Sequence, residues 1–250
     1  MNNHIDKLPP PTPSLATASF LAKMSKVALI LGGGARVGNA VANGLASSGY
    51  KVAIGRRTPK AEGLSNGVKP IKLDVTSTAS IVSAFDEVRT SFGAVPNVVV
   101  YNAGDLQKAA DPNDIFSTDV ELLKGDAEIN IWGVYTALQQ ATKGWASLPD
   151  DTNFPKVFIL TGNILPFAPI PHLLSLGLGK AAAVHLIESA TLTEEFQKKN
   201  WRFYFATGTT ADGGPVYRGL DGPAHAKAYG ELIEKKEQGP WDVRFVAHFP

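Results

Sequence analysis

The residues best suited to chemistry form a glycine-rich bend, Gly32 to Gly38, directly after a short apolar run. Glycine lets the backbone turn sharply and approach a pyrophosphate, and a helix that begins there offers free N–H groups and partial positive charge. Structural turns also use glycine, but a bend between a strand and a helix favours a dinucleotide site. The residues expected to contact its phosphates are Gly32, Gly34, Arg36, Val37 and Gly38.

A pair of arginines follows the next apolar run, where NAD-binding proteins usually offer a carboxylate to the ribose hydroxyls. Arg56 and Arg57 stand at this position, and the next acidic residue is Glu62. A carboxylate would repel a 2′-phosphate, whereas a guanidinium binds it through charge-assisted hydrogen bonds. The pair therefore predicts NADP(H) as the cofactor; the alternative is that the two arginines only begin a solvated loop.

The elements that must position these residues show as short apolar runs separated by amphipathic stretches, the pattern of a parallel sheet covered by helices. In the stretch 77–92, apolar residues recur at Ile81, Phe85, Val88 and Phe92, which predicts a helix with one apolar face. We expect an α/β fold, a Rossmann-type doubly wound parallel sheet of about seven strands with helices on both faces. The predicted strands are 26–31, 51–55, 71–75, 97–101, 156–160, 202–206 and 242–249.

The order of the motifs resembles the short-chain dehydrogenase/reductase family over residues 26–206. The family's TGxxxGxG turn corresponds to Leu31, Gly32, Arg36 and Gly38, with arginine in place of the middle glycine. The resemblance implies that Asp74 and Val75 contact the adenine ring. It also implies that the remaining cofactor contacts come from Asn102, Ala103, Gly104, Lys180, Thr207 and Thr209, the two threonines lying in the loop after the sixth strand.

The same resemblance breaks at the catalytic centre. Lys180 matches the lysine of the YxxxK motif, but Leu176 stands where the family has its tyrosine, and Asn163 replaces its serine. Asn130 matches the asparagine that supports a proton-relay water. We therefore expect Asn130, Asn163 and Lys180 to form the catalytic set, in a chain similar to divergent fungal members of the family without the tyrosine.

The missing tyrosine leaves three possibilities: another acid, a substrate that needs none, or a protein that does not reduce a substrate at all. Another acid could donate the proton, the candidates being His172, Tyr101, Tyr135 and His185. An imine substrate would need no strong acid and would suit an apolar pocket of Leu165, Phe167, Leu173, Leu174 and Leu176. The sequence thus predicts an NADP(H)-dependent reductase of an organic carbonyl or imine; the alternative is an NADP(H)-binding protein without turnover, or a redox-neutral enzyme.

Composition limits the remaining possibilities. With 250 residues, 44% of them hydrophobic, and a net charge of +1, the chain suits one large domain without a global field for nucleic acid or membranes. The absence of cysteine excludes disulfides and thiolate chemistry. No apolar run approaches the roughly 20 residues that cross a bilayer.

From these limits we expect a flexible extension, 1–23, before one domain, 24–250, in the cytoplasm. The substrate is expected to be a small organic molecule. No metal is expected, and His225 is interpreted as a surface or helix-start residue. Family members commonly pair through their fourth and fifth helices, so a homo-oligomer is expected by analogy.

Overall fold

The computed structural model describes residues 26–148, 154–216 and 219–247. The expected extension 1–23 lies outside these residues. Within them, seven parallel strands form one sheet in the order β3-β2-β1-β4-β5-β6-β7, which confirms the predicted fold class. The strands are β1 (Val27–Leu31), β2 (Lys51–Arg56), β3 (Val68–Lys72), β4 (Val98–Tyr101), β5 (Lys156–Thr161), β6 (Trp201–Thr209) and β7 (Asp242–Val246).

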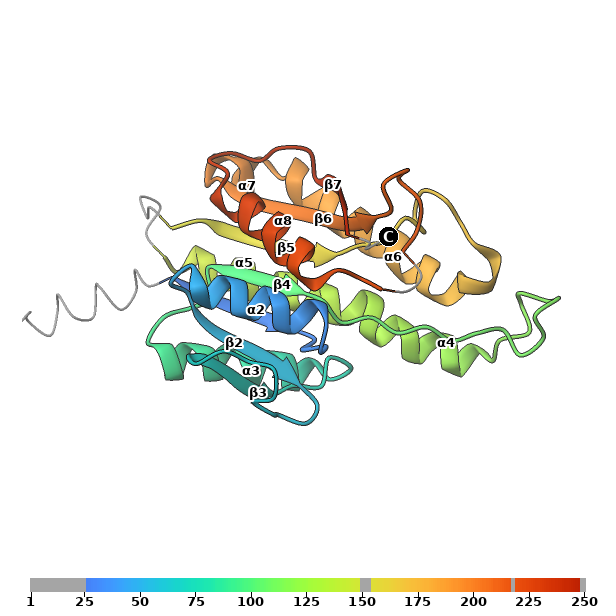
Figure 1. The fold of residues 1–250 in the computed structure, drawn as a ribbon, viewed down its shortest axis with the longest axis horizontal. Coiled ribbons are helices and arrows are strands. Elements are labelled where there is room, and N and C mark those ends of the chain that lie inside the picture. Colours follow the sequence, from blue (N-terminus) through green and yellow to red (C-terminus); the bar gives the residue numbers. More distant parts are fainter. Residues whose placement is uncertain (1–25, 149–153, 217–218, 248–250) are drawn as a thin grey trace, which may run out of the picture.

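Helices cover both faces of the sheet (Figure 1). One face packs against α3 (Thr78–Phe92), α5 (Gly133–Ala146) and α6 (Leu174–Leu192). The other packs against α2 (Val37–Ser47) and α8 (Gly222–Glu234). The shorter elements are α4 (Val120–Ala127), a π-helical turn η1 (Glu128–Trp132), a 3₁₀ turn η2 (Pro171–Leu173) and α7 (Glu194–Lys198).

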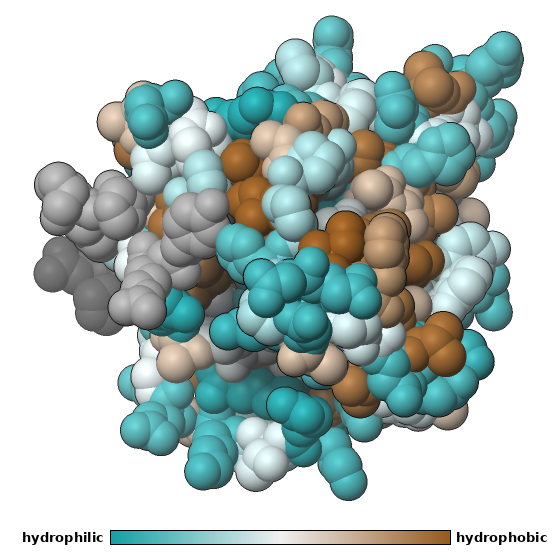
Figure 2. Space-filling model, turned by 90° about the vertical axis from the view of Figure 1, so that its right-hand side faces the viewer, coloured by the Kyte–Doolittle hydropathy of each residue, from teal (hydrophilic) through white to brown (hydrophobic). Residues whose placement is uncertain are grey.

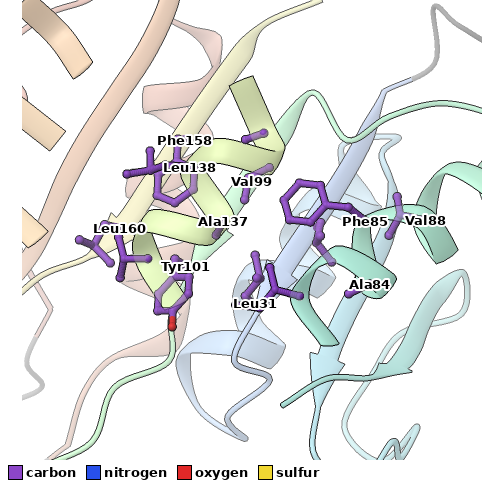
Figure 3. Close-up of a cluster of buried hydrophobic side chains, with 14 of the residues drawn as sticks. Leu31, Ala84, Phe85, Val88, Val99, Tyr101, Ala137, Leu138, Phe158 and Leu160 are labelled. Carbon is purple, nitrogen blue, oxygen red and sulfur yellow. The ribbon is translucent and has the colours of Figure 1, made fainter. Parts of the chain in front are cut away.

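Each face has its own apolar core. Figure 3 shows part of the core under α3 and α5, where Phe85 and Val88 of α3 approach Leu31 and Val99 of the sheet. On the opposite face, two valines and one leucine along α2 are all buried with side chains of α8. These three are Val37, Val41 and Leu45.

Four predicted strand boundaries are wrong by three residues. The third strand begins at Val68 rather than at 71. It ends at Lys72, not at 75, because the Asp74 carboxylate accepts hydrogen bonds from Thr76 N (3.0 Å) and Thr76 Oγ1 (2.7 Å) and turns the chain. The sixth strand continues to Thr209, because residues 205–209 pair with β7. The predicted last strand, 242–249, ends at Val246, although residues 248–250 lie outside the described chain.

His225 is not a surface residue. It lies in the first turn of α8, as the helix-start interpretation has it, but it is only 1% exposed. Its ring makes edge contacts with the rings of Tyr229 and Phe245. The Asp221 side chain caps this helix by accepting a hydrogen bond from Ala224 N (3.0 Å).

The expectation about apolar runs also needs a correction. Among the described residues, the 22-residue segment Pro171–Leu192 has the length and composition of a membrane-crossing helix, with a mean hydropathy of 1.2 over an 18-residue window. This segment packs against β6, α4 and η1, and it buries Ser175, Gly179, Lys180 and Ala183. A helix that buries an ammonium against a sheet has the contacts of a core helix.

The parallel strands bring all their carboxyl ends to one edge of the sheet. Successive strands are added towards one edge of the sheet from β1 to β3 and towards the other edge from β4 to β7. Ligands of open α/β sheets bind outside the carboxyl ends of the strands at the point where this order reverses, here between β1 and β4. Figure 2 shows this side of the molecule, where hydrophobic side chains gather among hydrophilic ones.

Candidate functional site

The glycine-rich bend between β1 and α2 is held by backbone hydrogen bonds. The N–H groups of Gly32 and Gly33 donate to Gly55 O (3.3 and 2.9 Å), and Gly34 N donates to Gly32 O (2.9 Å). Gly32 has φ +102°, and a Cβ there would lie 2.4 Å from Ala103 N, so no other residue fits without strain. A Cβ on Gly34 would meet only Asn102 Nδ2, at 4.0 Å, so this side of the bend is open for a ligand.

Two adjoining cavities lie beyond the bend. The smaller, about 390 Å³, is lined by the bend, by Arg56 and Arg57, and by residues 73–76. The larger, about 680 Å³, extends from Arg36 to residues 161–165 and α6. Both are lined by Gly34 and by residues 102–105, so they form one elongated groove. This shape fits a two-part ligand whose centre lies over the open side of Gly34.

The two arginines at the end of β2 have different environments. The Arg56 guanidinium donates to Asn39 Oδ1 and to Lys60 O (3.1 Å), and its stem packs against Gly33. Arg57 is exposed beside the smaller cavity. Hydrogen bonds from Thr76 lower the pKa of Asp74, and the positive charge of Arg57 lowers it further. Of the two arginines, Arg57 therefore presents the exposed guanidinium to a ligand at this end of the groove, whereas the guanidinium of Arg56 is bonded within the protein.

Asn102 connects the bend to the neighbouring strands. Its amide nitrogen donates to Gly32 O (2.9 Å), and its amide oxygen accepts from Thr161 Oγ1 (3.0 Å) at the end of β5. Thr161 Oγ1 in turn accepts from the buried hydroxyl of Tyr229 on α8 (2.9 Å). This chain of hydrogen bonds fixes the floor of the groove at the point where the two cavities meet.

Lys180 is enclosed at the base of the larger cavity. It lies one helical turn after Leu176, and both residues line the cavity. The ammonium donates to Thr161 O (2.8 Å), and the residue is only 6% exposed. Burial lowers the pKa of Lys180 from 10.5 to about 8, because removal from water disfavours the charged form.

Asn130 lies behind the cavity rather than on it. It is 1% exposed in the π-helical turn, where its amide nitrogen donates to Asp105 O (2.9 Å) and its amide oxygen accepts from Asp105 N (3.3 Å). A Cβ on Gly179 would lie 2.4 Å from the Asn130 Cβ, so α6 touches this turn directly. Asn130 therefore positions the segment after β4 and the helix that carries Lys180.

Asn163 lines the larger cavity in the segment after β5. Its amide oxygen accepts a hydrogen bond from Leu165 N (3.0 Å), which fixes the orientation of the side chain. The amide nitrogen, a donor with two hydrogens, is the part of this group left for a ligand. Such a group polarises or orients a bound oxygen but is a poor acid.

The structure gathers most of the predicted cofactor residues along the groove but leaves out three. Thr207 and Thr209 lie inside β6, both under 5% exposed, and Gly208 lines the larger cavity between them. Their predicted contact with a cofactor therefore lacks support from the cavity lining. The remaining predicted contacts, except Gly38, line one cavity or the other. A Cβ on Gly38 would lie 2.8 Å from Gly32 O, so this glycine closes the bend.

The predicted apolar pocket is partly right. Leu165, Leu173 and Leu176 line the larger cavity, but Leu174 is not among its lining residues. Phe167 is 44% exposed and instead lies under the guanidinium of Arg244 (4.9 Å). Sequence reasoning missed five apolar lining residues, which fall in irregular segments without periodicity. They are Leu106, Ile164, Ile170, Val216 and Leu220.

None of the four alternative acids lines the larger cavity. His172, Tyr135 and His185 are exposed elsewhere on the surface. Tyr101 is buried and donates its hydroxyl hydrogen to Ile129 O (2.6 Å). The prediction that one of them replaces the missing tyrosine is therefore not supported by the geometry of the described residues.

Comparisons with known proteins agree with this architecture. The model of a family described as short chain dehydrogenase matches residues 26–200. The short chain dehydrogenase/reductase dmxR12 of Cryptosporiopsis sp. (strain 8999) is 34% identical over 233 residues, which cover 89% of this chain and 92% of that protein. The 3-oxoacyl-acyl-carrier-protein reductase FabG of Escherichia coli (strain K12) is 37% identical over 109 residues, 38% of this chain and 43% of that protein.

A solved structure shows the same fold at lower identity. It is the crystal structure of 3-ketoacyl-(acyl-carrier-protein) reductase from Brucella melitensis complexed with NADH. The two structures superpose with a TM-score of 0.73 over 88% of this chain and 96% of that one, at 19% identity.

Proposed function

The chain belongs to the short chain dehydrogenase family, and from that premise we propose that it is an NADP(H)-dependent reductase of an organic carbonyl or imine. The observation that carries the proposal is the single groove, which has an exposed guanidinium at one end and a buried ammonium at the other. Leu176 occupies the position of the family's tyrosine, so the catalytic site is atypical.

The described residues fit a nicotinamide dinucleotide. Gly34 and the start of α2 would hold the diphosphate, because the first N–H groups of a helix lack partners inside it. Asp74 and Val75 would hold the adenosine half, and Lys180 the nicotinamide half. When bound, such a cofactor supplies a hydride to the substrate. Asn163 would then orient the substrate through its amide nitrogen.

The preference for NADP(H) rests on charge at the end of β2. Arg57 is exposed beside the smaller cavity, and Arg56 is anchored by Asn39 with its stem on the bend. The nearest carboxylate, Asp74, accepts hydrogen bonds from Thr76. An arginine pair in this position supports recognition of a 2′-phosphate.

Calorimetry with purified protein tests this preference. We expect Arg57→Ala and Arg56→Ala each to weaken NADPH binding at least tenfold more than NADH binding, about 1.4 kcal/mol. Arg89→Ala, which removes an exposed arginine of α3, is the matched control and should change neither affinity. If Arg56→Ala and Arg57→Ala weakened the binding of NADPH and NADH equally, these arginines would not recognise the 2′-phosphate.

Turnover separates the reductase from its alternative, a protein that binds NADP(H) without reaction. The absence of a tyrosine among the described residues that line the larger cavity favours that second candidate. NADPH oxidation across a panel of ketones, aldehydes, imines and quinones decides between them. Consumption of NADPH with any of these supports the reductase, and tight NADPH binding with no consumption supports the binding protein.

Pairing with a second copy of the chain is also proposed. Large apolar side chains are exposed along α4, the π-helical turn and α5, as the analogy with family members predicts. These are Val120, Leu122, Trp132 and Tyr135, which are 49–59% exposed. Light scattering on the purified protein would give the mass of the assembly.

A further inference from the structure

The larger cavity has few groups able to move a proton. Among the described residues, its ionisable lining consists of Arg36, Asp105 and Lys180. Arginine keeps its proton in proteins. Asp105 is exposed rather than enclosed, and one of its carboxylate oxygens accepts a hydrogen bond from Leu106 N (2.9 Å). Only Lys180 combines enclosure with a proton that can leave.

The ammonium of Lys180 keeps donors available. Of its three N–H bonds, one is directed to Thr161 O (2.8 Å), and among the described residues no carboxylate forms an ion pair with it. The ionisable groups of the surrounding elements bond elsewhere. Tyr101 donates to Ile129 O, Tyr229 donates to Thr161 Oγ1, and the carboxylate of Asp126 accepts from Gln107 N.

Substitution of tyrosine by leucine also removes the group that would stand between this ammonium and a substrate. Leu176 precedes Lys180 by one turn on the same face of α6 and offers no polar atom. We propose that Lys180 is itself the proton donor, and that the substrate is a neutral ketone or aldehyde held between Leu176 and the Asn163 amide. This inference rests on the proposed function and narrows its substrate class.

The proton transfer balances as follows. A bound reduced nicotinamide dinucleotide would supply a hydride to the carbonyl carbon and would itself be oxidised by two electrons, while the C=O π electron pair would move to oxygen. One Nζ–H bond of Lys180 breaks, its electron pair stays on nitrogen, and the proton forms the O–H bond of the alcohol. The neutral amine regains a proton from solvent through the open cavity.

The same ammonium disfavours an iminium substrate. Two positive charges in a cavity with apolar walls repel each other more strongly than they would in water. An oxygen that becomes negative during reduction is stabilised by the same charge. Lys180 therefore selects for the carbonyl and against an imine that binds in its protonated, iminium form.

Binding of three molecules with one skeleton tests the charge preference without turnover. We expect calorimetry to show that benzoate, whose carboxylate stands for the developing alkoxide, binds at least tenfold more tightly than benzamide, and benzylammonium more weakly than both. Lys180→Met should abolish this order, and Lys143→Met, which alters an exposed lysine of α5 outside the cavity lining, should keep it. Benzoate affinity should also fall as the pH rises through about 8, because the amine then loses its charge. An unchanged order in Lys180→Met would overturn the proposal.

Kinetics test the proton itself with the best ketone of the panel. Lys180→Arg keeps the charge but has no proton to give, so kcat should fall at least a hundredfold with KM for NADPH changed less than threefold. Added methylammonium should restore part of the activity of Lys180→Ala but not of Lys180→Arg. If Lys180 only held the cofactor, its substitution would instead raise the KM for NADPH, and methylammonium would not restore the activity of Lys180→Ala.

A competing donor is tested by Tyr217→Phe, because Tyr217 lies between two cavity-lining residues, Val216 and Leu220, in the sequence. The proposal expects unchanged kcat, and a hundredfold loss would assign the proton to that phenol. Failure of the wild-type protein to oxidise NADPH with any substrate rejects the reductase. The benzoate series would still report on Lys180 in that case.

Discussion

The enclosed ammonium of Lys180 illustrates how a single residue can favour chemistry at the expense of stability. Burial lowers its pKa from 10.5 to about 8, a change that corresponds to roughly 3 kcal/mol against the charged form. The hydrogen bond to Thr161 O offsets part of this cost. Because the depressed pKa lies below the unfolded value, stability should rise as the pH increases from about 8 towards 10.5.

Removing the charge should therefore stabilise the fold. We expect Lys180→Met to raise the free energy of unfolding at pH 7 by about 1 kcal/mol or more, because a methionine side chain needs no hydration. Urea unfolding measures the change, with the exposed Lys143→Met of α5 as the matched control. A destabilised Lys180→Met protein would show that the hydrogen bond outweighs the cost of burial.

Many of the residues that line the groove could be predicted from the sequence alone. The glycines of the bend, the arginines after β2, Asn163 and Lys180 could all be predicted, because each stands at the end of a recognisable strand or in a motif. The sequence could not reveal that Asn39 holds Arg56 or that Thr207 is buried inside β6. Both depend on contacts between segments that are distant along the chain.

At the level of elements, the contact between α6 and the π-helical turn positions the catalytic side chains. Gly179 touches Asn130 of that turn, and Gly133, the first residue of α5 after it, lies against the hydroxyl of Tyr101. The helical stretch around residue 130 could be recognised from sequence, but its π-helical turn could not. That turn depends on packing against α6 and β4, and π turns of this kind often lie at functional sites.

Two glycines of α6 give a matched test of this contact. A Cβ on Gly179 would lie 2.4 Å from Asn130 Cβ, so Gly179→Ala should destabilise the protein by about 1–3 kcal/mol. A Cβ on Gly177 would meet Leu165 at 3.8 Å, an ordinary contact, so Gly177→Ala should be neutral or stabilising by about 1 kcal/mol. Equal effects in urea unfolding would mean that the two helical surfaces separate easily.

For the molecule as a whole, the parallel sheet of about seven strands followed from the apolar runs, whereas the segment between the last two strands did not. Residues 210–221 have no periodic pattern, yet Pro215, Val216 and Leu220 line the larger cavity. The glycines and prolines there interrupt the apolar pattern that would otherwise mark these lining residues. His225 was misjudged for the same reason, since a histidine after Gly-Pro-Ala resembles a surface residue until β7 and Tyr229 cover it.

The burial of His225 should make the stability of the whole fold depend on pH. Burial lowers the pKa of His225 below 6.5, so the unfolded chain binds a proton more readily than the folded one. Stability is therefore full above about pH 6.5 and falls as the pH decreases towards 5. We expect the Tm of the wild type to fall by roughly 2–4 °C more than that of His225→Phe over this range. His185→Gln, which alters an exposed histidine, should behave like the wild type.

The close packing of α8 on the glycine-rich bend has a consequence for how the protein is made. A Cβ on Gly222 would lie 2.8 Å from Arg36 O, so the last helix supports a loop that was synthesised almost 190 residues earlier. During synthesis, that loop lacks its support and the cavity lacks one wall until α8 has left the ribosome. A nascent chain should therefore retain a nucleotide only after the residues of α8 have emerged from the exit tunnel.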